Sequence, residues 1–233
     1  MPTSPQRPRS LCLPAATRPL ALLALTGITA CGSAASMPPV AYRTPVPGTV
    51  YDYGTFTNRI TAVDGWRTSY VDDRGREGRR VALFITEDPR RPLVVDSVAV
   101  DSLWPLRLGH GATVLAHQGE EVYRWEFRVL DTTTVTVPAG TFRTIVVEGT
   151  QLPELVRVPQ AATSAVHTWW YGPTLGAVVR FRSVYLTGPS AGRRFEGELR
   201  AIRAPGAADS AAAQPETGPA ADSGAAGGAP PRA

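Results

Sequence analysis

Strict alternation of apolar and charged side chains is the feature that most limits how this chain can fold. In Tyr123–Val129, large apolar residues at every second position alternate with Arg124, Glu126 and Arg128. Successive side chains of a β-strand point to opposite faces, so this period of two predicts a strand with one buried and one solvated face. No window of ordinary length has the apolar spacing of an amphipathic helix. The sequence therefore predicts an all-β, antiparallel domain.

Turn residues divide the rest of the domain into short strands of similar length. The other segments expected to form strands are residues 49–57, 68–72, 80–86, 93–100, 112–116, 133–137, 143–148, 179–185 and 195–201. Residues 152–165 are expected to form a loop, because they contain Pro153 and Pro159. This spacing predicts a strongly curved antiparallel sheet or a partly open barrel.

Two motifs have the chemistry of tight turns between strands. Pro138 suits the second position of a turn, and Gly140 can adopt the left-handed conformation that closes a short hairpin. Farther along, a strand of large aromatic residues meets Gly172-Pro173 and returns through Gly176 into a valine-rich strand. Proline is not expected in the middle of a central strand, which places both prolines at turns.

The ends of the chain differ in composition from the predicted domain, residues 48–203. Residues 1–30 combine arginines with the apolar run Leu20–Leu25, the layout of a signal peptide, and that run is too short to span a bilayer. Residues 31–47 are rich in proline and small residues and are expected to form a flexible tether. Residues 204–233 have no aromatic residue, valine, leucine or isoleucine. They therefore predict a disordered tail.

Cys31 follows Ile28-Thr29-Ala30 directly after the apolar run. This pattern resembles the lipobox of bacterial lipoproteins, in which an aliphatic residue, a small residue and Ala or Gly precede the cysteine. The resemblance implies diacylglyceryl transfer to the sulfur of Cys31, cleavage before it and acylation of the new amino group. More than one acyl chain gives a stable anchor, so the membrane is an expected partner. The alternative is an ordinary signal peptide with a chance cysteine.

The residue after the cysteine bears on location. Gly32, rather than an aspartate, follows Cys31. By analogy with proteobacterial sorting, this favours a lipid-anchored protein of the bacterial cell envelope, in the outer membrane and facing the periplasm.

Three turn motifs lie within Leu103–Arg182: Trp104–Gly109, Val137–Phe142 and Trp170–Val178. Together they resemble a group of uncharacterised β-rich envelope proteins and lipoproteins. Those proteins carry a Pro-Leu-x-x-Gly step, a Pro-Ala-Gly-Thr-Phe hairpin and a Trp-Tyr-x-Pro-x-x-Gly-x-Val return. The resemblance implies a curved antiparallel sheet or barrel and transfers neither an activity nor catalytic residues.

The charge of the chain argues against binding to nucleic acid. All 24 basic residues are arginine, and the formal net charge is +4. Arg7, Arg9 and Arg18 lie in the predicted signal peptide, so the remainder carries +1. A nucleic-acid partner is not expected, because the basic surface that such proteins use is missing.

Motifs for catalysis and metal binding are also missing from the sequence. His110, His117 and His167 show neither His-x-His nor His-Glu-x-x-His spacing and are expected to be two loop residues and one strand-end residue. There is no Gly-x-Ser-x-Gly elbow, Gly-x-Gly-x-x-Gly loop or P-loop. The sequence therefore predicts no enzyme activity, no metal site and no cofactor.

Aromatic residues give the one local hint of a binding surface. Trp169 and Trp170 are neighbours on an expected strand, so their side chains point to opposite faces. One of them is then exposed or faces a concavity, which makes Trp169, Trp170 and Tyr171 a candidate ligand surface, with ordinary packing as the alternative. Trp125, on the alternating strand, is expected in the core.

Two functions follow as expectations. The first is a non-enzymatic envelope lipoprotein that binds a hydrophobic small molecule in a β-cavity, since a curved sheet of this size can enclose one ligand. The second is a structural or assembly accessory that docks another envelope protein. A carrier predicts an apolar cavity, and an accessory predicts a packed interior with an exposed patch.

Overall fold

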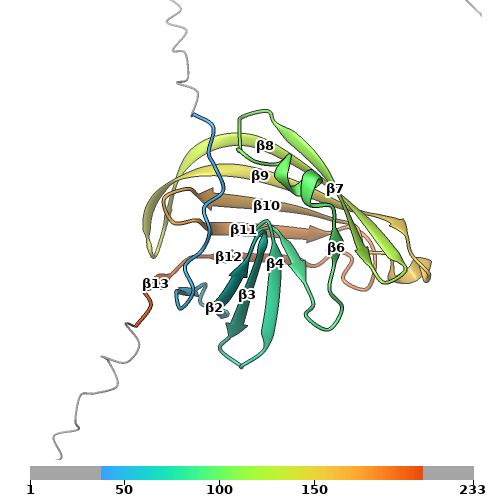
Figure 1. The fold of residues 1–233 in the computed structure, drawn as a ribbon, viewed down its shortest axis with the longest axis horizontal. Helices are drawn as coiled ribbons and strands as arrows, with labels where there is room; N and C mark the ends of the chain where they lie inside the picture. The colour runs from blue at the N-terminus through green and yellow to red at the C-terminus, as the bar shows by residue number, and fades with distance from the viewer. Residues whose placement is uncertain (1–37, 207–233) are drawn as a thin grey trace, which may run out of the picture. The chain divides into compact units, whose positions relative to one another are not determined.

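The computed structural model describes residues 38–206. The chain there forms two antiparallel sheets that do not close into one barrel (Figure 1). The predicted all-β antiparallel class is confirmed. Cys31, the predicted signal peptide and residues 207–233 of the predicted tail lie outside the described residues.

The larger sheet has seven strands and provides most of the domain's long hairpins. In order across the sheet these are β12 (Arg194–Glu198), β11 (Ala177–Tyr185), β10 (Ala165–Gly172), β9 (Gly140–Leu155), β8 (Glu121–Val137), β7 (Gly111–Gln118) and β6 (Val94–Val95). The strands curve as they run across the domain (Figure 1).

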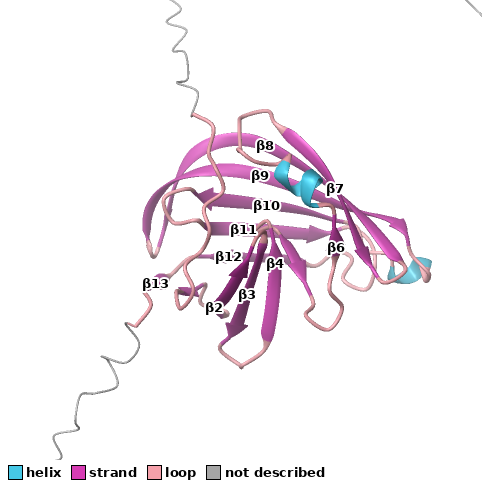
Figure 2. Cartoon of the chain, viewed as in Figure 1, coloured by secondary structure: helices cyan, strands magenta, loops and turns pink. Residues whose placement is uncertain are grey.

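The smaller sheet has six strands, and most of them come from the first part of the domain. In order they are β13 (Ala201–Arg203), β1 (Val50–Asp52), β2 (Thr57–Asp64), β3 (Arg67–Asp72), β4 (Glu77–Val81) and β5 (Ile85–Glu87). Two short helices complete the described chain, α1 (Ser97–Asp101) and the 3-10 helix η1 (Pro159–Ala161) (Figure 2).

The hairpin between β8 and β9 forms where turn chemistry predicted it. Val137 pairs with Gly140, so Pro138 and Ala139 make a two-residue loop. Gly140 has a φ of 132°, a backbone conformation that side chains disfavour. The segments expected at residues 123–129 and 133–137 both belong to the single strand β8. The register between β8 and β9 is irregular between Val129 and Asp131.

The second predicted turn connects β10 to β11. The amides of Leu175 and Gly176 both donate to the carbonyl of Gly172, which closes the turn. Gly176 has a φ of 65°, and a side chain there would meet the backbone of Arg43. A glycine is therefore required for both the conformation and the close approach.

The prediction of a strand over residues 93–100 is wrong for most of its length. Only β6 is a strand, and α1 follows it. The Asp96 carboxylate accepts a hydrogen bond from the amide of Val98, which satisfies a free donor at the start of α1. This local cap outweighs the strand preference of the valines.

Other boundaries also differ from the sequence prediction, and residues 195–201 form parts of β12 and β13, in different sheets, rather than one strand. Residues 80–86 form β4 and β5 rather than one strand, since Ala82 and Leu83 have φ values of 51° and 71°. Residues 49–57 are interrupted by Gly54, and β2 was not predicted. Residues 152–155 continue β9 instead of beginning a loop, and the prolines lie near the end of that strand and in η1.

The two sheets pack against each other through a shared hydrophobic cluster. Val81, Phe84 and Ile85 of the smaller sheet's edge lie in the same buried cluster as Phe127 and Trp169 of the larger sheet. Trp125 belongs to this cluster and is 6% exposed, as the alternating pattern predicted. Burial of such large side chains stabilises the domain by roughly 2 kcal/mol each.

Residues 38–47, which were expected to belong to a flexible tether, lie against the domain. The backbone of Val40 pairs with that of Leu106. The Tyr42 ring packs on Trp66 and Trp104, with ring centroids 4.5 and 5.1 Å apart. Arg43 donates a hydrogen bond to the carbonyl of Thr174. This segment therefore has the contacts of a packed strap.

Candidate functional site

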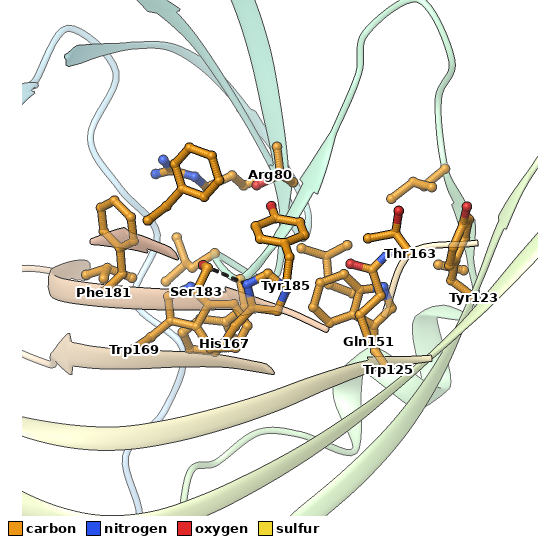
Figure 3. A pocket seen from close by; sticks show the side chains of 18 of the residues that line it. Arg80, Tyr123, Trp125, Gln151, Thr163, His167, Trp169, Phe181, Ser183 and Tyr185 are labelled. Carbon is orange, nitrogen blue, oxygen red and sulfur yellow. Dashed lines mark hydrogen bonds between the residues drawn. The ribbon is translucent and has the colours of Figure 1, made fainter. Parts of the chain in front are cut away.

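A cavity of about 470 Å³ lies between the two sheets (Figure 3). Its floor comes from β7–β12 and the loop before β10. Its opposite wall comes from β4, β5, the turn between them and the loops before β2 and β6. The volume lies within the roughly 300–1,000 Å³ of small-molecule sites. The lining side chains are mainly aromatic and aliphatic, with polar groups at a few places.

The register of the larger sheet places small and large residues side by side on the face that carries the cavity. One row of paired residues crosses five strands: Phe127, Gly149, His167, Ser183 and Phe195. The two neighbours of His167 in this row are small, and the Trp169 and Phe127 rings lie over Gly149. A side chain at Gly149 would meet the Trp169 ring at 2.6 Å. Glycine here permits a close approach within the sheet, as glycine in a strand interior often does.

His167 is held in an aromatic wall on the cavity floor. Its ring is stacked on that of Trp169, with centroids 5.3 Å apart, and lies 5.2 Å from that of Trp125. Its Nδ1 is hydrogen-bonded to Ser183 Oγ at 2.8 Å (Figure 3). Its Nε2 is buried without a hydrogen-bond partner among the described residues. This nitrogen is therefore both shielded from solvent and unpaired among the described residues.

Burial decides the charge state of this histidine. The side chain is 8% exposed, and desolvation lowers the pKa of His167 from 6.5 to about 4. The ring is therefore neutral at pH 7, and it contributes a hydrogen-bonding atom rather than a charge.

The His167–Ser183 pair does not make a catalytic triad. A serine nucleophile needs a base near the working pH and a third group that orients the base. The pKa of His167 lies far below neutrality, and no carboxylate is found among the described residues that line the cavity. The arrangement suits binding better than acyl transfer.

Arg80 provides the only permanent charge among the described residues that line the cavity. It projects from β4, on the wall across from His167 and Ser183 (Figure 3). Its guanidinium lies 4.9 Å from the centroid of the Tyr70 ring, and Asn58 can accept a hydrogen bond from it at 3.0 Å. Both partners are neutral.

The neighbouring arginine has a different environment. Arg79 pairs with Glu87, and Arg80 pairs with Thr86, so the two arginines point to opposite faces of β4. Glu87 forms ion pairs with Arg79 and Arg67 at 3.6 and 3.4 Å. No ion pair joins Arg80 to a carboxylate within residues 38–206.

The three aromatic residues singled out from the sequence lie in three different places. Trp169 is 7% exposed and lines the cavity. Trp170 points to the other face of β10, where Arg180 lies 5.7 Å from the centroid of its ring. Tyr171 is fully buried next to Phe84 and does not line the cavity. The structure therefore brings one of the three to the site.

Sequence reasoning missed the polar residues of the site. His167 was expected at a strand end, but it pairs within β10 and faces the cavity. His117 lies in β7, and His110 lies in a loop, where its Nε2 is 2.6 Å from the carbonyl oxygen of Ser102. The small residues Gly149 and Ser183 were the available signal, but only the strand register places them beside His167.

The described residues contain neither a metal-binding cluster nor a membrane-spanning helix. Residues 38–206 hold no cluster of three or more His, Cys, Asp or Glu side chains placed to bind a metal ion. Within the same range, no helix has the length and apolar character needed to cross a membrane.

Comparison with known proteins gives distant structural neighbours and no sequence match. No family model matches the sequence, and no curated protein matches it. The hypothetical lipoprotein YmcC from Escherichia coli K12 has 14% identity and a TM-score of 0.43, over 67% of this chain and 84% of that one.

Two further solved structures are more distant. An exported protein with a YmcC-like fold from Bacteroides fragilis has 13% identity and a TM-score of 0.39, over 71% of this chain and 100% of that one. A lipoprotein from Parabacteroides distasonis has 11% identity and a TM-score of 0.38, over 72% and 100%.

Proposed function

We propose that this chain is a non-enzymatic, lipid-anchored protein of the bacterial envelope that binds a hydrophobic small molecule between its two sheets. The cavity of about 470 Å³ carries this proposal. An accessory that only docks another protein would be expected to have a filled interior. Here a cavity remains beside Trp169, so the interior between the sheets is not filled.

The membrane anchor in this proposal rests on the sequence. The lipobox-like residues before Cys31 supply it, and Gly32 favours the outer membrane, facing the periplasm. In this proposal the lipid anchor keeps the protein at a membrane, where apolar ligands are abundant.

Native mass spectrometry tests the binding function. A chain that begins at Ser36 contains every strand and both hydrophobic clusters, so it keeps the whole described fold without the lipidated cysteine. After gentle purification, we expect an additional mass from a bound apolar compound. A mass equal to that of the bare chain, unchanged after incubation with envelope lipid extract, would contradict the proposal for the compounds in that extract.

A further inference from the structure

The polar side chains that line the cavity carry a positive charge and no negative charge. Arg80 is positively charged, His167 is neutral, and no carboxylate lines the cavity among the residues that the structure describes. A half-buried guanidinium has five N–H donors, and an anion uses them better than neutral partners do. The groups around Arg80 are the Tyr70 ring, the Asn58 amide and the Tyr53 hydroxyl, and none of them carries a negative charge.

The strands next to Arg80 provide no carboxylate that pairs with it. The nearest carboxylate along the paired strands is Glu87, which points to the other face and already pairs with Arg67 and Arg79. In a cavity that is partly enclosed by protein, the field of an unpaired cation is screened less than it is in open water. The site is therefore electrostatically complementary to one negative charge.

The rest of the cavity suits an apolar body. Trp125, His167 and Trp169 present a continuous row of rings on the floor. Phe56 and Phe181 add rings near the Arg80 wall, with centroids 6.0 Å apart.

We propose that the cavity binds an amphiphile with one anionic group, which Arg80 holds, and an apolar body that packs along Trp125, His167 and Trp169. This inference rests on the proposed function, since it names the chemical class of the same ligand. A free carboxylic acid and a single-chain phosphate ester share this chemistry.

Amphiphiles with the same chain and different head groups test this directly. The chain that begins at Ser36 is titrated at pH 7 with decanoate, decyl phosphate, decan-1-ol and decyltrimethylammonium, and binding is followed by tryptophan emission and calorimetry. We expect the anions to bind about tenfold more tightly than the alcohol, which a charge-assisted hydrogen bond can provide, and the cation to bind most weakly. The tighter of the two anions identifies the preferred head group.

Variants separate the role of Arg80 from general charge effects. Arg80→Gln should bind the anions and the alcohol equally, and Arg80→Lys should keep most of the preference. Arg182→Gln is the matched control, because Arg182 is exposed and lies between the cavity residues Phe181 and Ser183 on the opposite face of β11. It should leave the preference unchanged.

The outcomes distinguish this inference from the proposed function. If anions, alcohol and cation bind the parent chain equally, the charge selectivity is overturned and hydrophobic binding stands. If none of the four binds, both proposals fail for single-chain amphiphiles. A preference for anions that survives in Arg80→Gln would also overturn the assignment to Arg80.

Discussion

At the scale of single residues, His167 and Gly149 determine the character of the cavity. They are paired neighbours on β10 and β9. His167 supplies a buried polar ring, and Gly149 leaves room for the Trp169 ring on which His167 stacks. Neither role is visible from local spacing in the sequence, because both depend on which strand pairs with β10. Each role predicts a measurable change in stability.

The neutral state of His167 predicts a pH-dependent stability. The folded pKa of about 4 lies below the unfolded value of 6.5, so between these values the unfolded chain binds more protons. The stabilisation is therefore complete above pH 6.5 and is lost as pH falls toward 4. From pH 7 to pH 5 we expect the parent chain to lose on the order of 2 kcal/mol more than His167→Gln, measured by urea unfolding.

The control for this prediction is His117→Gln, on the exposed side of β7. It should lose stability with pH in parallel with the parent chain. If His167→Gln also follows the parent chain, then His167 is not held neutral by burial.

The substitution Gly149→Ala is expected to disturb packing and lower the free energy of unfolding. The added carbon would lie 2.6 Å from the Trp169 ring and 3.1 Å from that of Phe127. We expect a loss of about 1–3 kcal/mol in the free energy of unfolding, the usual effect of overpacking a core. Thr150→Ala, the next residue on the other face of β9, should change it less. An unchanged or higher stability for Gly149→Ala would show that Trp169 moves freely into the cavity.

At the scale of elements, local chemistry predicted some parts of the fold and failed at others. The β8–β9 hairpin and the turn after Gly172 were predicted, because proline and glycine determine those backbones within a few residues. The break between β4 and β5 was not predicted, because Ala82 and Leu83 adopt left-handed conformations that these residue types rarely adopt. Tertiary packing decides such positions.

Residues 38–47 were expected to form a tether, but they pack on the domain, so we expect them to contribute to its stability. Tyr42→Ala removes the ring that packs on Trp66 and Trp104, and we expect a loss of about 2 kcal/mol in thermal or denaturant unfolding. Val46→Ala is the matched control, because Val46 is 55% exposed. If the Tyr42→Ala variant is as stable as the parent chain, the packing of Tyr42 does not contribute to stability.

At the scale of the whole described domain, the sequence predicted the all-β class and a curved antiparallel sheet. It did not predict that a second sheet would pack on the first, because β2 was missed and β13 was joined to β12. The cavity belongs to this scale, since its lining comes from both sheets. Its location could therefore not be read from any one segment, although Trp169 was among the candidate residues.

The most direct test of binding within the cavity compares Trp169 with its neighbour Trp170. A bromine atom quenches tryptophan emission on contact, and a neutral ω-bromoalkanol keeps the test independent of Arg80. Trp169 lines the cavity, whereas Trp170 lies on the other face of β10. Quenching in the parent chain should be weakened by Trp169→Phe and retained in Trp170→Phe. Equal quenching in the two variants, or none in the parent chain, would contradict binding of an apolar molecule between the sheets.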